Sequence, residues 1–413
     1  MMLPAKKTMS LLDFDAAQAR LAASAVRPET DETLPLEQLD GRVLAHDITA
    51  RHDLPPADNS AMDGYAVRWA DITSAGLTLP VQQRCFAGQT PEPLQPGQAI
   101  RLFTGSLIPD GADTVIMQED TREDEHGVTF ERPPKSAGTH IRRQGEDMHK
   151  DHVILTRGTS IGPGAIAMLA AQGFTQASVT PKVRVGILST GDELVAPGQA
   201  LPAAGIYNSN TPMLAALCRG LGAQPALLRH APDDTGAIAS ALAALCAECD
   251  LVLSAGGVSV GEKDLVKPVI ESMGGTLELW RVRMKPGKPV ALAHLRGRPV
   301  VGLPGNPVSA FVVFTLLVSP LIRGMQGRHT VYPPVRRGVL AHSGTPGGER
   351  DDFLRVQAHQ QGPGTPQLTA HPQQSSGAQA SLAWAHGLAR IPAGARLHAG
   401  AEVDWYAFSD WLA

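Results

Sequence analysis

Residues 250–264 read DLVLSAGGVSVGEKD, the pattern of a buried strand followed by a glycine-rich loop and an acidic helix start. The apolar run at 251–253 is what a parallel strand covered on both faces requires. Gly256, Gly257 and Gly261 allow a ligand to approach the backbone where a Cβ atom would clash. The segment therefore predicts a parallel sheet with a ligand site at its edge.

Two acidic residues, Glu262 and Asp264, close this segment. A carboxylate cannot bind phosphate itself, but it can hold a divalent cation that does. The segment thus favours a nucleotide-like or pyrophosphate ligand bound with Mg²⁺, although it matches neither the P-loop nor the GxGxxG fingerprint. An ordinary tight turn between strand and helix is the alternative, and this segment alone leaves both open.

The composition excludes several classes of protein. Of the 413 residues, 43% are hydrophobic and 18% charged, as in soluble globular proteins. A net charge of −4 without a long basic run argues against nucleic acid as a partner. Residues 310–318 are too short for a membrane span and no signal-peptide core is present, so we expect a cytoplasmic protein. Cys246 and Cys249 lie in an alanine-rich helical pattern, which favours two small thiols over a metal or redox site.

Composition changes along the chain predict a multi-domain α/β protein. Residues 10–27 carry apolar side chains at helical spacing. A part rich in Pro, Gly and Asp, with short β-like runs, follows. After it, strands and helices alternate, which is typical of a doubly wound domain with a mostly parallel sheet. Further short strands come last. The predicted regions are a helical linker region (7–50 with 145–180), a β-rich second domain (51–144), the α/β domain (181–326) and a C-terminal β domain (327–413).

The α/β region can be divided into individual elements. A residue that can cap a helix precedes a proline at Thr211-Pro212 and again at Asn306-Pro307, so each pair predicts a helix start. The predicted strands are 183–188, 225–230, 250–254 and 299–303, and the predicted helices are 211–221, 234–248, 262–273 and 307–318.

The loops that follow these strands are unusually polar. In open sheets of this kind ligands bind at the carboxyl ends of the strands. Glu193, Asp233 and Asp264 occur in three such loops, and three converging carboxylates would repel one another unless a cation intervened, which again predicts Mg²⁺. Taken singly, each is also compatible with a solvated helix cap, and for Asp234 the cap is the better interpretation.

A stiff turn, Met284-Lys285-Pro286-Gly287-Lys288-Pro289, places two lysines three residues apart. Two ammonium groups fixed by a turn suit a small oxyanion. Two surface lysines beside a turn are the alternative, and in isolation the better one.

Eight motifs together resemble one family. NSAMDGYAV (59–67), TGSLIPDGAD (104–113), RRQGEDM (142–148), STGDEL (189–194), NSNTPML (208–214), SAGGVSVGEKD (254–264), MKPGKP (284–289) and GLPGNPVSAF (302–311) occur in the family's order and spacing. They resemble the MoeA-type molybdopterin molybdenumtransferases, which are similar to the C-terminal domain of gephyrin. The resemblance spans essentially the whole chain.

The resemblance implies a reaction and an assembly. Members of the family take adenylylated molybdopterin and molybdate, cleave the adenylyl anhydride, release AMP and leave molybdenum on the dithiolene sulfurs. They act with a divalent cation, usually Mg²⁺, as homodimers whose active site is shared between subunits. Contacts with the molybdopterin adenylyltransferase and with downstream molybdoenzyme machinery are also expected, but none with nucleic acid or membranes.

The resemblance also assigns roles to residues. Molybdate has only its oxygens for recognition, so lysine, arginine and hydroxyl donors suit it, and a carboxylate-held Mg²⁺ would neutralise the leaving phosphate. The implied catalytic residues are Asp63, Thr104, Asp147, Glu193, Asp233 and Asp264, with Glu193 and Asp264 as metal ligands. The implied molybdopterin nucleotide-binding residues are Ser189, Gly191, Gly256, Gly257, Ser259, Gly261, Pro304 and Asn306. The implied molybdate-binding residues are Lys285, Lys288, Arg350 and Ser376.

The C-terminal region departs from the family pattern. The family often has G-R-x-E-F where this chain has Glu349-Arg350-Asp351-Asp352-Phe353, and Ser376-Gly377 is followed by Ala-Gln-Ala instead of an apolar run.

Three rival functions remain. A stand-alone adenylyltransferase would lack the second and C-terminal domains, a non-enzymatic scaffold would not need the acidic set and the lysine pair, and a nucleotide pyrophosphatase would act without molybdate.

Overall fold

The computed structural model describes residues 11–257, 264–342, 348–360, 362 and 364–413. The chain divides into two compact units. One comprises residues 11–45, Gly158–Gly162 and Gln176–Ala413, and the other His46–Arg157 and Pro163–Thr175. The predicted linker region thus contributes residues to both units.

The larger unit is built on a six-stranded sheet, which confirms the predicted α/β domain. Four strands are parallel, and two antiparallel strands extend one edge. The sheet order is β17 (Gln224–Ala231), β14 (Arg184–Thr190), β18 (Leu251–Ala255), β22 (Arg298–Leu303), β21 (Pro289–Leu295) and β19 (Thr276–Arg281).

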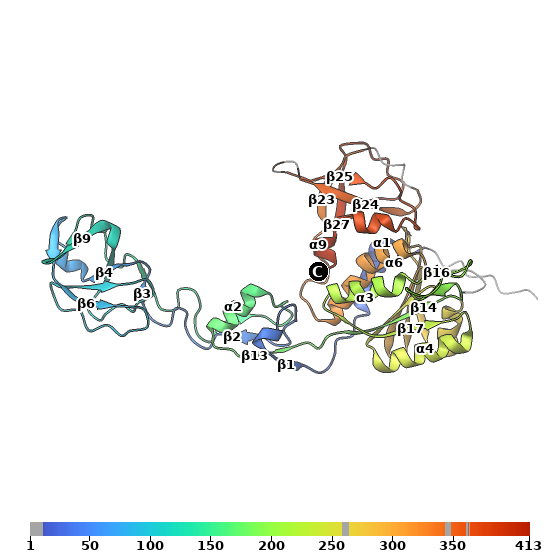
Figure 1. The fold of residues 1–413 in the computed structure, drawn as a ribbon, viewed down its shortest axis with the longest axis horizontal. Helices are drawn as coiled ribbons and strands as arrows, with labels where there is room; N and C mark the ends of the chain where they lie inside the picture. Colours follow the sequence, from blue (N-terminus) through green and yellow to red (C-terminus); the bar gives the residue numbers. More distant parts are fainter. Residues whose placement is uncertain (1–10, 258–263, 343–347, 361, 363) are drawn as a thin grey trace, which may run out of the picture. The chain divides into compact units, whose positions relative to one another are not determined.

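Helices cover both faces of this sheet, as expected of a doubly wound fold (Figure 1). Leu251 and Leu253 of β18 belong to the hydrophobic cluster on one face, and Val252 between them belongs to the cluster on the other. One face carries α1 (Phe14–Ala23), α3 (Asn210–Gly220), α6 (Pro307–Val313) and α7 (Ser319–Met325), and the other carries α4 (Thr235–Glu248) and α5 (Val266–Ser272).

Several predicted helix ends need correction. The cap predicted at Thr211-Pro212 is wrong, because α3 begins at Asn210 after Ser209 in the N-cap position. Helix α5 begins only at Val266, so Asp264 precedes the helix instead of opening it. The expected cap is confirmed at Asp234, whose side chain accepts a hydrogen bond from the N–H of Ala237 at 2.8 Å.

The last predicted helix is longer than expected. It starts after Asn306, as predicted, and runs through a π-helical segment (Phe314–Val318) into α7. Pro320 does not end it, because the proline stands in the first turn of α7. The stretch Pro307–Met325 is long and apolar enough to cross a membrane, but its most apolar window is 94% buried inside the protein, which marks it as a core helix.

The cysteine pair behaves as its helical context predicts. Cys246 lies in α4 and Cys249 caps the end of that helix, and both thiols are buried and unpaired. Burial raises the pKa of Cys249 to about 11. Both residues are therefore neutral core thiols at physiological pH.

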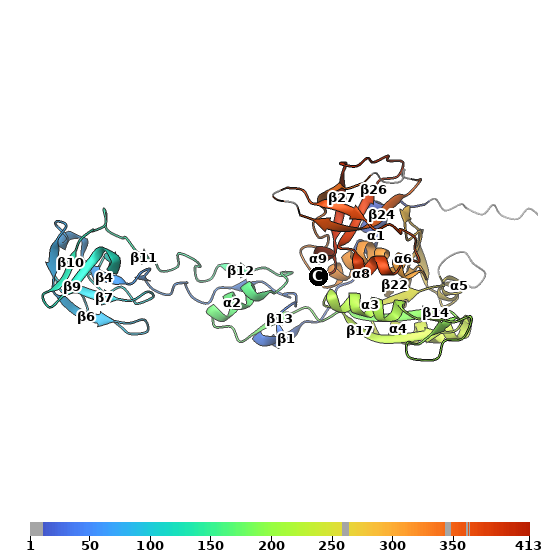
Figure 2. The same ribbon diagram turned by 45° about the horizontal axis from the view of Figure 1, so that its top comes forward.

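The C-terminal strands form a second six-stranded sheet, coloured orange to red in Figures 1 and 2. Its order is β20 (Met284–Lys285), β24 (Asp351–His359), β25 (Gln367–Ala370), β23 (Arg336–Leu340), β27 (Glu402–Ala407) and β26 (Gly387–Ile391). Because β26 also pairs with β24, the last five strands close on themselves like a barrel. Strand β20, from the α/β part of the chain, adds to this barrel from outside. Two short helices, α8 (Ala380–Trp384) and α9 (Phe408–Trp411), accompany the barrel.

The smaller unit is β-rich, as predicted, and appears in blue to green in Figure 1. Its two main sheets share a core that includes Tyr65, Val67, Val128 and Phe130. One sheet has the order β6 (Val81–Cys85), β7 (Ala99–Leu102), β4 (Gly64–Val67) and β8 (Thr114–Met117), and the other β5 (Leu77–Leu79), β10 (Gly127–Phe130) and β9 (Thr121–Asp124). The pair β3 (Asn59–Ser60) with β11 (Ile141–Arg142), the pair β2 (Ile48–Thr49) with β12 (Val153–Leu155), and α2 (Pro163–Ala171) complete this unit.

Two further two-stranded pairs belong to the larger unit. They are β1 (Glu32–Pro35) with β13 (Gln176–Val179), and β15 (Leu194–Val195) with β16 (Ile206–Tyr207). The second pair follows β14 directly and leads toward α3, so it shapes the loops at the carboxyl edge of the sheet.

Candidate functional site

A cavity of about 510 Å³ lies at the carboxyl ends of the four parallel strands. This is the edge at which open α/β sheets bind ligands. Most of the site residues predicted in the α/β domain line it together, although they come from loops far apart in the sequence. These lining residues are Gly191, Glu193, Asp233, Gly256, Gly257, Asp264, Pro304 and Asn306.

The glycine loop needs its glycines for two physical reasons. Gly257 has a φ of +70°, and a Cβ atom there would lie 2.5 Å from Val266 Cγ2. Gly256 has a φ of +97°, and its Cβ atom would lie 3.0 Å from the carbonyl oxygen of Thr190. A side chain at either position would clash and strain the backbone. The loop is therefore packed tightly against the end of β14.

The cavity is acidic. Glu193, Asp233 and Asp264 line it, while no lysine, arginine or histidine does so among the residues that the structure describes. The Asp233 loop is held in place because its backbone N–H donates to Asp192 Oδ1 at 3.0 Å. Three carboxylates around one space favour a bound cation.

Carboxylate oxygens are the kind of ligand that Mg²⁺ takes in proteins. In the described part of the chain, no three acidic, histidine or cysteine side chains stand close enough to form a complete metal site. Mg²⁺ does not need one, because it commonly takes one or two carboxylates and completes its octahedron with waters and substrate phosphates. Glu193 and Asp264 could serve as that carboxylate pair.

Polar residues that sequence reasoning had not selected complete the cavity wall. Thr190 and Asn210 line it, and Thr190 Oγ1 and Asn210 Oδ1 are buried and have no hydrogen-bond partner among the residues that the structure describes. Ser189, a predicted binding residue, is 1% exposed and does not line the cavity. Its hydroxyl accepts a hydrogen bond from Asn208 Nδ2 at 2.9 Å, so it supports a lining residue from behind. The runs S-T-G and N-S-N, both within the quoted motifs, are the signal that could have identified Thr190 and Asn210.

The four predicted molybdate residues do not line the cavity. Two of them adjoin it. Ser376 Oγ accepts a hydrogen bond from Nδ2 of Asn306 at 3.2 Å, and Lys288 is exposed and directly precedes the lining residue Pro289. Ser376 therefore contacts a residue of the cavity wall, and Lys288 is a neighbour of that wall along the chain.

The other two predicted molybdate residues are engaged with the protein itself. Lys285 Nζ lies 2.8 Å from Asp352 Oδ2, and Arg350 Nη1 donates to the carbonyl oxygen of Met284 at 3.2 Å. Asp352 was missed by sequence reasoning, because only the pairing of β20 with β24 places it opposite Lys285. The lysine side chain is half-exposed, so it is accessible to a ligand.

The smaller unit contains the remaining predicted residues. Thr104 donates two hydrogen bonds to Asp63 Oδ1, from its N–H and from its hydroxyl, each at 2.8 Å. These bonds, the backbone one first, lower the pKa of Asp63. Asp147 does not join this pair. It is exposed and lines a separate cavity of about 640 Å³ with Met148 and other residues of the same unit.

Ser259 and Gly261, also predicted to bind the pterin nucleotide, lie outside the described residues, and so does Glu262.

Comparison with known proteins places this geometry in a family. The description "MoeA N-terminal region (domain I and II)" matches residues 12–173, "Probable molybdopterin binding domain" matches 186–324, and "MoeA C-terminal region (domain IV)" matches 337–408. A molybdopterin molybdenumtransferase of Haemophilus influenzae is 40% identical over 333 residues, which cover 80% of this chain and 82% of that protein. The chain belongs to the MoeA family of molybdopterin molybdenumtransferases.

Other MoeA family members agree over greater length. Molybdopterin molybdenumtransferase 2 of Mycobacterium tuberculosis is 37% identical over 384 residues, covering 90% of this chain and 94% of that protein. The crystal structure of the molybdopterin biosynthesis moeA protein from Pyrococcus horikoshii OT3 matches with a TM-score of 0.83 at 30% identity, covering 96% and 99% of the two chains. The chain is therefore an enzyme of molybdenum cofactor biosynthesis with the MoeA fold.

Proposed function

We propose that the chain inserts molybdenum from molybdate into adenylylated molybdopterin, cleaves the adenylyl anhydride and releases AMP. The observation that carries this proposal is the acidic, glycine-lined cavity at the carboxyl edge of the sheet, in a member of the MoeA family. Its volume of about 510 Å³ is within the range of small-molecule sites. Gly256 and Gly257 line it and bring backbone without side chains to the cavity wall.

The cation is the second part of the proposal. Acids cannot bind the pyrophosphate of the substrate directly, because like charges repel. Glu193 and Asp264 would hold Mg²⁺, and Mg²⁺ supplies charge neutralisation at the phosphate that leaves. Asp233 lines the same cavity and adds to the negative potential that retains the cation.

The molybdate residues form the third part. Lys285, Lys288, Arg350 and Ser376 offer ammonium, guanidinium and hydroxyl donors, which suit a tetrahedral dianion. Asn306 supports this placement, since it lines the cavity and also donates to Ser376. Molybdate would then meet the pterin where the α/β domain borders the C-terminal barrel.

The assembly and location are also proposed. We infer a homodimer in which Asp63, Thr104 and Asp147 of one subunit serve the cavity of its partner, because the first two form a polar pair outside the unit that holds the cavity. Contact with the molybdopterin adenylyltransferase and with downstream molybdoenzyme machinery follows from the reaction, since the substrate and the product are both labile. A cytoplasmic location suits such exchange and the unpaired thiols.

The test is AMP release from adenylylated molybdopterin, measured with and without molybdate and Mg²⁺. Release that depends on molybdate supports insertion, whereas release without molybdate would indicate a pyrophosphatase. Asp264→Asn keeps the shape of the side chain and removes its charge, so we expect a correctly folded protein whose AMP release falls by roughly two orders of magnitude or more. Excess Mg²⁺ should restore part of it.

Asp234→Asn is the matched control for this substitution. Asp234 follows Asp233 but caps α4, and its side-chain oxygen can still accept the Ala237 hydrogen bond as an amide. Its AMP release should stay close to that of the unaltered protein. If Asp264→Asn releases AMP normally, or if that variant alone fails to fold, Asp264 is not the cation ligand and the cation site lies elsewhere.

A further inference from the structure

Three consecutive residues at the start of β24 each hold a different partner. Arg350 donates to the carbonyl oxygen of Met284 at 3.2 Å, and Asp352 holds the ammonium of Lys285 at 2.8 Å. Asp351 lies between them, and its side chain, only 6% exposed, binds an arginine. The anchoring of Asp351 therefore fixes the backbone that carries both neighbours.

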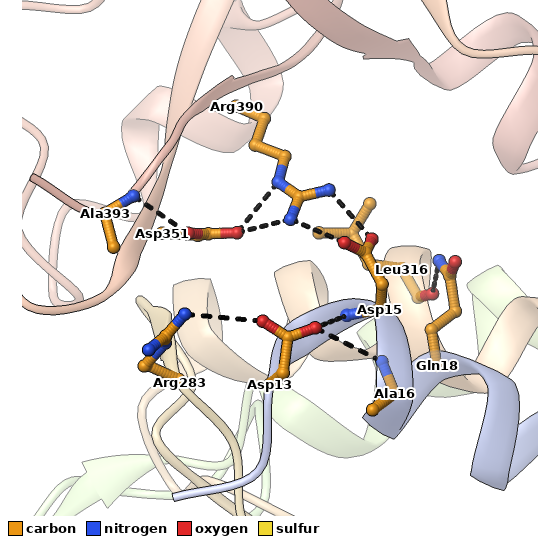
Figure 3. Close-up of polar contacts among 9 residues, drawn as sticks. All are labelled: Asp13, Asp15, Ala16, Gln18, Arg283, Leu316, Asp351, Arg390 and Ala393. Atoms are coloured by element: carbon orange, nitrogen blue, oxygen red, sulfur yellow. Dashed lines mark hydrogen bonds and ion pairs between the residues drawn. The ribbon is translucent and has the colours of Figure 1, made fainter. Parts of the chain in front are cut away.

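That anchor is Arg390 of β26, shown in Figure 3. Its Nε donates to Asp351 Oδ2 at 2.8 Å, and the backbone N–H of Ala393 donates to the other carboxylate oxygen at 2.9 Å. The Nη1 and Nη2 atoms donate to the two oxygens of Asp15 at 2.8 and 2.9 Å. The guanidinium also lies 4.8 Å above the ring of Phe14. One arginine thus joins the first turn of α1 to the start of β24.

The opposite side of the lysine-bearing segment is held by the residues just before α1. Leu12 pairs with Val282, donating to the carbonyl oxygen of Arg281 at 3.0 Å and accepting from the N–H of Arg283 at 2.8 Å. Asp13 caps α1 and also lies 3.4 Å from Arg283 Nη2 (Figure 3). The segment that leads into β20 is therefore held by the N-terminal residues on one side and by β24 on the other.

These contacts close into a ring. The N–H of Asp351 donates to the carbonyl oxygen of Arg283 at 3.2 Å, so α1, the β20 segment, β24 and Arg390 are linked in a circle. Strand β20 has only two residues and lies at the outer edge of its sheet, so its own ladder cannot define its position well. A flexible lysine needs such external support to present its charge at one place.

We propose that Asp15, Arg390 and Asp351 form a positioning cluster that sets the place of the Lys285 ammonium for molybdate. The inference rests on the proposed function, because it takes Lys285 to be a molybdate ligand. None of the three residues lines the cavity. Their role is to keep β24 and β20 in register, so that the lysine is aligned before molybdate arrives and little ordering cost remains at binding.

The test is Asp15→Asn in the full-length protein, with AMP release measured as a function of molybdate and, separately, of adenylylated molybdopterin. Asp15 is 62% exposed, so the fold should persist, which a thermal melt can verify. We expect the molybdate concentration for half-maximal release to rise at least about threefold, because a support residue is lost while the ligand remains. The rate at saturating molybdate and the pterin dependence should not change. Asp15→Glu, which keeps the charge, should recover most of the loss.

Asp410→Asn is the matched control. Asp410 also binds one arginine through both of its oxygens, Arg336 at 2.6 and 2.7 Å, and likewise tethers a helix to the barrel. It has no contact with the Lys285 segment among the described residues, so its molybdate dependence should stay normal even if its melting temperature falls. If Asp15→Asn and Asp410→Asn shift the molybdate dependence equally, the cluster acts only as an ordinary structural salt bridge.

The decisive comparison uses Lys285→Met as a background. If the cluster acts through Lys285, Asp15→Asn adds no further change to the molybdate dependence of Lys285→Met. Additive effects would overturn the positioning role. If Lys285→Met itself has normal molybdate dependence, the molybdate assignment in the proposed function fails first, and this outcome is distinct from normal behaviour of Asp15→Asn alone.

Discussion

The ion pair between Lys285 and Asp352 predicts that a double variant needs less molybdate than one of its single variants. Lys285→Met keeps roughly the length of the side chain and removes the proposed charge-assisted contact with molybdate, and such a contact is typically worth about 1.5–3 kcal/mol. The lysine side chain is 51% exposed, so we take the lower end, about 1.5 kcal/mol, or roughly a tenfold higher molybdate requirement.

The same substitution leaves Asp352 without its counter-ion, next to a site for a dianion. Two unit charges about 4 Å apart in water interact by about 1 kcal/mol, and a dianion doubles this before salt screening. Screening at ordinary salt leaves roughly 1 kcal/mol of this repulsion, or about fivefold, so the single variant should need on the order of fiftyfold more molybdate. Combining Lys285→Met with Asp352→Asn removes the repulsion. The molybdate requirement should then return to about ten times that of the unaltered protein, so the double variant should need less molybdate than the single one.

The assay is AMP release against molybdate concentration at saturating adenylylated molybdopterin, with each protein also tested for substrate binding and melting temperature. Lys182→Met serves as the control, because that exposed lysine lies outside the cavity lining, before β14. Because screening weakens the repulsion, the gap between single and double variants should narrow at high salt. A double variant that is as poor as the single, or poorer, would refute the reasoning and make Asp352 a necessary support of the site.

Two further predictions concern the smaller unit. Mixing Asp63→Ala subunits with Asp264→Ala subunits, each inactive alone, should restore about a quarter of the unaltered activity if the active site is shared in a homodimer, because about half of the dimers are mixed and one of the two sites in each is intact. Mixed dimers without activity, checked by native mass spectrometry, would disprove sharing. Thr104→Val removes the hydroxyl donor but keeps the N–H, so the lowered pKa of Asp63 should move part of the way up toward its ordinary value of about 4. The stabilisation from this ionised carboxylate is present above about pH 4 and is lost as pH falls through the folded pKa. Carbon NMR of the Asp63 carboxyl group measures the pKa shift. If Thr104→Val leaves the titration of Asp63 unchanged, the backbone hydrogen bond alone lowers the pKa.

The periodic parts of the chain could be predicted from its sequence. The apolar runs that became β14, β18 and β22 are buried on both faces, and such runs have few structural alternatives. The polar loops after them had to meet at one edge, because parallel strands end on the same side. For this reason Glu193, Asp233 and Asp264 could be placed in one cavity before any coordinates were known.

The remainder depended on pairing between distant segments. Nothing local in Met284–Lys285 indicates that it leaves the α/β sheet to pair with β24, and without that pairing neither Asp352 nor the Arg390 cluster can be associated with Lys285. The start of α3 was misplaced because Asn210, Thr211 and Ser209 can all cap a helix, and the tertiary contact of Asn210 Nδ2 with the carbonyl oxygen of Gly305 at 2.6 Å lies outside local sequence rules.

Strand β20 lies in the α/β part of the chain but pairs with β24 of the C-terminal barrel, and this has a consequence for how the protein is made. Lys285 leaves the ribosome before Asp352 and Arg390, so β20 emerges before the strand that pairs with it. During that interval the lysine segment has no partner in the barrel, and Phe353, Leu388 and Tyr406 are still missing from the hydrophobic cluster that covers one face of the α/β sheet. If Lys285 binds molybdate as proposed, completion of the C-terminal barrel is the event that makes a newly synthesised chain competent for the metal.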